Sequence, residues 1–255
     1  MDDSSSQKKR LYRFMAAKWA LRSIEKRELR VGRLVESNDP FEFVPGIKDE
    51  DLLPGAPRAA VLEQLRKAQA DLNPIIGLLS FSSTPEEPTL WSHYAESHRG
   101  IALGFDVTTN GNVLALMKVK YTPKRPTYPR TLLNRPAWEK FIKKTFTTKA
   151  PGWNAESEYR VLVPITRAGC RLENGDYFFP IADNTCALAE VILGCRCPLD
   201  DSYVDQTLRQ HGFEGVRLAR AKLSVDAFEA ECSPARHEET RRAGKSTLYE
   251  SKPER

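Results

Sequence analysis

The sequence has 255 residues, of which 40% are hydrophobic and 29% are charged, and it carries a formal net charge of +5. These proportions are those of an ordinary globular protein with enough apolar material for a core. The small positive charge does not require a nucleic-acid partner, although it favours phosphate-bearing ligands over cationic ones.

The sequence lacks the patterns that mark membrane spans and secreted domains. No run approaches the roughly 18 to 20 consecutive apolar residues of a membrane helix, and residues 1–10 have no apolar stretch typical of a secretory signal. The cysteines number five, whereas disulfide-stapled secreted domains are usually shorter and carry an even number. We therefore expect a cytoplasmic protein with no membrane partner.

Short apolar and amphipathic segments follow one another without the regular rhythm of a parallel sheet. The pattern predicts a strand over 11–14, a helix over 18–28, a strand over 29–35, a turn at 37–42, a helix within 48–73 and a strand over 77–83. It continues with a helix over 90–96, strands over 100–106 and 115–121, a helix around 138–146, and strands over 158–165, 188–193 and 216–223. This order predicts an α+β fold with a mixed, mainly antiparallel sheet. We expect one domain over 11–235 between a disordered leader (1–10) and a disordered charged tail (236–255).

The segment 122–150 is strongly basic, with eight Lys or Arg residues and a single acidic residue, Glu139. Its aromatic and basic side chains together would suit a non-catalytic module that binds single-stranded nucleic acid or nucleotides. However, Trp138, Phe141, Ile142 and Phe146 recur at helical spacing, which favours a helix that turns these side chains to the core and its lysines to water.

A series of short motifs occurs in a specific order along the chain. They are LYRF (11–14), NDPFE (38–42), LSFS (79–82), LWSHYA (90–95), GIALGFD (100–106), Trp153 followed by ExEYR (156–160), and AEVILG (189–194). Together they resemble the pattern of the DUF2971 family over roughly residues 11 to 222. This resemblance implies no particular reaction, so the chemistry has to be argued from the residues.

Three polar clusters fall on predicted strands. Arg13 lies on the first strand, Ser80 and Ser82 are two residues apart on another, and Glu156 and Glu158 are two residues apart at the start of a third. Residues two apart in a strand point to one face of the sheet. A purely structural interpretation also stands: the arginine would bridge a surface acid, and the glutamates would form a solvated strand edge.

The order Arg, Ser-x-Ser, Glu-x-Glu is similar to the Arg-Ser-Glu layout of ADP-ribosyltransferases, which implies an ADP-ribosyltransferase-like fold and NAD as substrate. The resemblance implies that Arg13, beside Tyr12, would hold a phosphate or ribose of NAD. Ser82 would brace the nicotinamide pocket, and Glu158 would stabilise the cationic transition state as nicotinamide departs. Glu156 would take the proton of an acceptor. The enzyme would be a transferase or an NAD glycohydrolase, such as a bacterial toxin or defence effector, with a protein or nucleic acid as acceptor.

Two further motifs supply candidate binding residues. Trp91, His93 and Tyr94 would join Ser80 and Ser82 in the cofactor pocket, because aromatic and imidazole rings can stack on nicotinamide. The alternative is a helix that packs Trp91 and Tyr94 inward. The candidate substrate-binding residues are Asn38, Asp39, Glu42 and Arg160. Asn38 and Asp39 equally fit a turn whose side chains cap the backbone.

Metal binding has little support in the sequence. Cys195 and Cys197 have no second pair at a zinc-like spacing, so no metal cofactor is expected. A third alternative is a metal-dependent nuclease that would use Asp39, Glu42, Glu156 and Glu158, since carboxylates suit magnesium. The acceptor and the oligomeric state stay open.

Overall fold

The computed structural model describes residues 8–48, 52, 57–108, 116–127, 135–166, 169–182 and 186–234. The strands are β1 (Lys8–Met15), β2 (Glu28–Arg30), β3 (Ile76–Ser82), β4 (Ile101–Thr108), β5 (Leu116–Lys118), β6 (Lys120–Tyr121), β7 (Thr148–Lys149), β8 (Glu158–Pro164), β9 (Arg171–Glu173), β10 (Asp176–Pro180), β11 (Cys186–Leu193), β12 (Arg217–Leu223) and β13 (Ala230–Pro234). The α-helices are α1 (Ala17–Lys26), α2 (Arg58–Leu72), α3 (Pro88–Tyr94), α4 (Arg135–Phe146) and α5 (Asp201–Gln210), with short 3-10 helices at η1 (Leu34–Glu36) and η3 (Pro151–Glu156).

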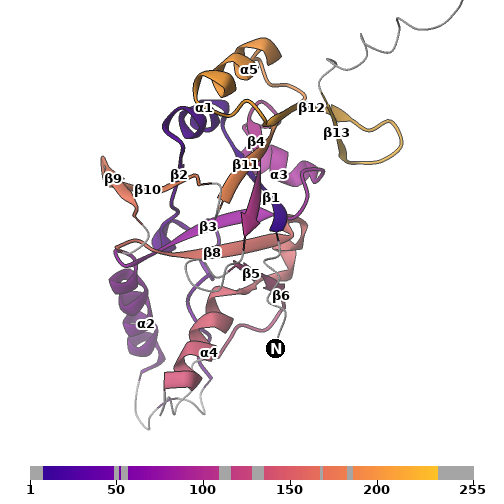
Figure 1. The fold of residues 1–255 in the computed structure, drawn as a ribbon. Helices are drawn as coiled ribbons and strands as arrows, with labels where there is room; N and C mark the ends of the chain where they lie inside the picture. Colours follow the sequence, from indigo (N-terminus) through magenta and orange to yellow (C-terminus); the bar gives the residue numbers. More distant parts are fainter. Residues whose placement is uncertain are drawn as a thin grey trace, which may run out of the picture.

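The main sheet has eight strands in the order β13-β12-β11-β4-β1-β3-β8-β5. Only the β11–β12 pair in this sheet is parallel. Figure 1 shows β3 and β8 running across the view while β4 and β11 stand upright, so the sheet curls sharply where β1 meets β3. The predicted α+β fold with a mainly antiparallel sheet is confirmed.

The largest hydrophobic cluster covers one face of this sheet. Leu103 and Phe105 of β4 are fully buried there, and Ile24 of α1 and Leu208 of α5 pack into the same cluster. Each such side chain contributes roughly 1.5 to 3 kcal/mol by leaving water. A smaller cluster around Trp91 lies on α3, β4 and β11, so the central strand β4 is buried on both faces.

Several predicted boundaries differ from the structure. The predicted strand over 29–35 is divided: β2 ends at Arg30, and η1 begins at Leu34. Gly32 bridges to Leu78 instead, which takes the chain away from β2 and onto β3. β1 begins at Lys8, inside the expected leader, and β13 follows the strand that was predicted to be the last. Residues 1–7 and the tail from 235 lie outside the described residues.

The helix α3 begins with its own local signals. Pro88 occupies its first turn, and the Glu87 carboxylate accepts a hydrogen bond from the Thr89 N–H at 3.1 Å. Proline at this position loses no helical hydrogen bond, and the carboxylate satisfies a free backbone donor. The helix is thereby anchored so that its last residue, Tyr94, reaches the cavity described below. Among the described residues, no helix is long and apolar enough to cross a membrane.

Candidate functional site

A cavity of about 360 Å³ lies where β1 and β3 diverge. β1 pairs along its whole length with β4, and β3 with β8, but the pairing between β1 and β3 is the single pair Tyr12–Ser82. Beyond that pair the strands separate, which leaves room for a ligand between them. Although Tyr12 and Arg13 alternate along β1, both reach the cavity at this divergence.

Most of the residues predicted for the site line this cavity, and they come from β1, β3, α3, η3, β8 and the turn after η1. They are Tyr12, Arg13, Asn38, Glu42, Ser80, Ser82, Tyr94, Glu156 and Glu158. Tyr12 lies opposite Ser82, and Ser82 lies opposite Glu158, so these residues form one row across three adjacent strands. Cross-strand neighbours of this kind point to the same face of a sheet.

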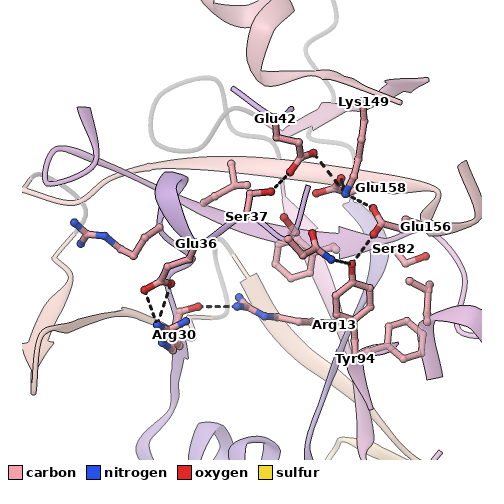
Figure 2. A pocket seen from close by; sticks show the side chains of 18 of the residues that line it. Arg13, Arg30, Glu36, Ser37, Glu42, Ser82, Tyr94, Lys149, Glu156 and Glu158 are labelled. Atoms are coloured by element: carbon pink, nitrogen blue, oxygen red, sulfur yellow. Dashed lines mark hydrogen bonds and ion pairs between the residues drawn. The ribbon is translucent and has the colours of Figure 1, made fainter. Parts of the chain in front are cut away.

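Buried charges form one wall of the cavity. Glu42, Glu156 and Glu158 surround Lys149 and Arg160, and all of these residues are buried. Lys149 Nζ lies 2.6 Å from Glu156 Oε2, 3.5 Å from Glu42 Oε1 and 3.6 Å from Glu158 Oε2. The wall therefore holds one more carboxylate than cations, and it presents negative charge to a ligand (Figure 2).

Glu158 is held in place by Arg160. The guanidinium Nε donates to Glu158 Oε1 at 2.8 Å, and Nη2 donates to Oε2 at 2.7 Å. Arg160 also donates to Glu42 Oε1 and to the Phe146 carbonyl. Burial acts to raise the pKa of Glu158, but the charges and hydrogen bonds of Arg160, Lys149 and Ser80 outweigh burial, so this pKa is lowered. Glu158 is thus an oriented, ionised carboxylate.

Glu156 reaches the same cluster by a different local structure. It ends η3, and Ser157 then takes a left-handed conformation (φ 45°) before β8 begins. The Tyr94 hydroxyl donates to Glu156 Oε1 at 2.6 Å and accepts from Asn38 Nδ2 at 2.8 Å. Burial, together with the Glu156 carboxylate, raises the pKa of Tyr94, so the phenol stays a hydrogen-bond donor.

The lowered pKa of Glu158 predicts a sensitivity to acid. Because the unfolded side chain keeps an ordinary pKa of about 4.3, the ion pair stabilises the folded state fully above that value and is lost as the pH falls through the lowered folded value. We expect the free energy of unfolding to fall less steeply with acid in Glu158→Gln than in the wild type. Urea denaturation midpoints at neutral and acidic pH measure this slope. If the free energy of unfolding falls with pH equally steeply in both proteins, groups other than Glu158 cause the acid sensitivity.

Four of the predicted residues do not line this cavity. Trp91 is fully buried, donates to the Pro85 carbonyl at 2.7 Å and packs edge-on against Phe14. His93 is exposed on α3. Asp39 Oδ1 accepts from the Phe41 N–H at 2.9 Å, which is turn chemistry, and it lines a separate cavity of about 210 Å³. Arg160 acts from behind the wall, through Glu158 and Glu42.

Other lining residues had not been predicted from the sequence. The main ones are Lys149, Arg30, Arg33, Glu36, Ser37 and Phe43. Lys149 belongs to the basic segment but is buried on β7, where its β6 partner and η3 enclose it. Lys149 lies seven residues before Glu156, and this spacing matches no sequence pattern that would predict their contact.

The helix α4 of the basic segment otherwise agrees with the prediction that its apolar side chains face the core and its lysines face water. Phe146 of α4 is buried against Leu34 and Phe43, and Ile142 packs beside it. Lys140, Lys143 and Lys144 are exposed, whereas the Trp138 side chain and Tyr128 lie outside the described residues. Within the described parts of the chain, no group of three or more His, Cys, Asp or Glu side chains is placed to hold a metal ion.

Comparison with known proteins gives one match. Residues 90–161 match the model of the family described as "Protein of unknown function (DUF2971)". The matched segment contains α3 from Leu90 onward, β4, Lys149 and the Glu156–Glu158 pair, and it supports the resemblance seen in the sequence motifs. No curated protein and no solved structure matches the chain.

Proposed function

We propose that the protein is an NAD-using enzyme of the ADP-ribosyltransferase or NAD glycohydrolase type. The observation that carries this proposal is the placement of Arg13, Ser82 and Glu158 on the adjacent strands β1, β3 and β8, around one cavity. The similarity to the Arg-Ser-Glu layout requires this convergence, and residues this far apart in the sequence could as easily have been separated by the fold.

The charges of the cavity suit the cleavage of an N-glycosidic bond. The bond between the ribose C1′ and the nicotinamide nitrogen breaks, its electron pair stays on the nitrogen, and neutral nicotinamide leaves. Positive charge then develops on the ribose, where the ionised Glu158 stabilises it. An acceptor hydroxyl or water forms the new bond to C1′, and its proton passes to Glu156. Arg160 and Lys149 position these carboxylates.

Nicotinamide release from NAD by the purified wild-type protein tests this proposal directly. We expect one nicotinamide for each ADP-ribose, which appears either free or attached to an acceptor. An enzyme of this kind would suit a toxin or defence effector, a setting motivated only by the resemblance to the transferases. A wild-type protein that releases no nicotinamide from NAD, whether or not it binds NAD, would contradict the proposal.

A matched control uses the exposed face of α4. Charge reversal at Lys140, Lys143 and Lys144, all exposed, should leave nicotinamide release unchanged because these residues lie outside the cavity lining. If the wild type binds nucleic acid but does not bind or cleave NAD, and this charge reversal abolishes the nucleic-acid binding, the protein is instead a non-catalytic binding module.

A further inference from the structure

The end of the cavity opposite the acidic wall is cationic. Figure 2 shows Arg13, Arg30 and Glu36 on one side, away from Glu42, Lys149, Glu156 and Glu158. Arg33 also lines the cavity, and it lies between β2 and η1. Three arginines therefore line a cavity whose other wall is negatively charged.

Within the described ranges of the chain, carboxylates neutralise only one of these arginines. Arg30 Nη2 lies 3.0 Å from Glu36 Oε2 and 2.8 Å from Asp176 Oδ1. Arg13 uses Nη2 to donate to the Arg30 carbonyl at 2.7 Å, which satisfies a donor but leaves the charge uncompensated. Among the described residues, no carboxylate forms an ion pair with Arg13 or Arg33.

Within the described residues, Arg13 and Arg33 also carry the two buried side-chain nitrogens that lack a hydrogen-bond partner. Nη1 of each is buried and has no hydrogen-bond partner. A buried polar group without a partner is costly, and a charged one more so, hence such groups are rare and need a specific explanation. Burial, with the nearby charge of Arg30, lowers the pKa of Arg13 to about 10, so the group is still protonated at neutral pH.

Packing, rather than an acid, holds Arg33 in position. Its guanidinium carbon lies 4.8 Å from the centroid of the Tyr177 ring on β10. Stacking on an aromatic ring fixes the plane of a guanidinium while leaving its N–H groups available. Arg13 and Arg33 thus line one cavity from two different elements, and each keeps one guanidinium nitrogen without a hydrogen-bond partner.

We propose that Arg13 and Arg33 together bind the diphosphate of a nucleotide ligand, with Arg33 as a specificity-determining residue for phosphorylated ligands. A diphosphate offers several anionic oxygens to separate guanidinium forks, which a single carboxylate cannot do. The assignment of the diphosphate to a nucleotide rests on the proposed function. The acidic wall then faces the uncharged or cationic end of the same ligand.

Calorimetric titration of the full chain with inorganic pyrophosphate, ADP and adenosine tests the anion site. We expect ADP and pyrophosphate to bind and adenosine to bind far more weakly. Arg33→Met should weaken ADP binding by about 10- to 100-fold, which corresponds to the loss of a charge-assisted hydrogen bond. Arg33→Lys, which keeps the charge but not the fork, should fall between Arg33→Met and the wild type.

Arg22→Met is the matched control, because Arg22 also stacks on an aromatic ring, at 3.9 Å from the Phe178 centroid, but lies outside the cavity lining. It should bind ADP as the wild type does. Three results would each overturn the assignment. The first is that Arg33→Lys, Arg33→Met and the wild type bind ADP equally well. The others are that the wild type binds adenosine as tightly as ADP, or that it binds neither ADP nor pyrophosphate. If ADP binding depends on Arg33 but NAD is not cleaved, the anion site is supported and the proposed function is rejected. If NAD is cleaved equally well with and without Arg33, the proposed function is supported and the anion site is rejected.

Discussion

Replacing Glu158 by Gln is expected to lower nicotinamide release from NAD by about two to three orders of magnitude, the usual effect of removing one preorganised electrostatic contact to a transition state. The amide keeps the shape of the side chain but carries no charge to stabilise the ribosyl cation. Because Glu158 is ionised and fixed by Arg160 through two hydrogen bonds, the wild-type carboxylate needs no reorganisation during the reaction. NAD binding should change much less than turnover.

Glu28→Gln is the matched control for this substitution. Arg171 holds Glu28 with the same paired geometry, Nε to Oε1 at 2.7 Å and Nη2 to Oε2 at 2.6 Å, but the pair lies outside the cavity lining. Turnover by Glu28→Gln should equal that of the wild type. If Glu158→Gln stays folded, as judged by its circular dichroism, and turns over NAD like the wild type, Glu158 has no catalytic role.

Replacing Arg160 by Met should cause the largest loss of stability, about 3 to 5 kcal/mol in the free energy of unfolding. The methionine fills much of the volume, but Glu158 and Glu42 lose their shared partner in a place where water cannot replace it. The Arg160 side chain is only 1% exposed, and the Glu158 side chain 6%. Urea denaturation monitored by fluorescence measures the loss.

Arg171→Met separates the effect of burial from that of the bond geometry. This arginine makes the equivalent paired contact to Glu28, but its side chain is 43% exposed, so its loss should destabilise the fold far less than the loss of Arg160. The double substitution Arg160→Met, Glu158→Gln should be more stable than Arg160→Met alone, because it removes one of the two buried carboxylates that lost their arginine partner. Equal losses in the two single variants would mean that the buried network contributes no more than a surface pair.

Strand periodicity made much of this site predictable from the sequence. Ser80 and Ser82 share a face of β3 because they are two residues apart, and Glu158 shares that face through its register with Ser82. The strand of Arg13 was predicted from its short aromatic run, and the α+β class from the irregular order of strands and helices. Whether these strands would be neighbours depended on the topology of the sheet, which local patterns do not encode.

Tertiary contacts account for the residues that the sequence did not reveal. Lys149 belongs to the basic segment, yet it is buried because carboxylates from two parts of the chain, Glu42 and the Glu156–Glu158 pair, converge on it. Arg33 lay within a predicted strand, but the chain leaves that strand when Gly32 bridges to Leu78. Trp91, by contrast, belongs to a motif of polar and aromatic residues and is a core residue, since apolar burial dominates for so large a side chain.

The single residue pair between β1 and β3 also makes the candidate cavity the place where two parts of the main sheet meet. Its walls belong to two continuous hydrogen-bonded units, β1 with β4 and β3 with β8, and each unit can stay intact while the angle between them changes. Side-chain bridges such as Lys9 to Tyr159, at 2.6 Å, and the Gly32–Leu78 contact limit that angle. A ligand that engages both Arg13 and Glu158 would therefore draw the two units together and set the width of its own site.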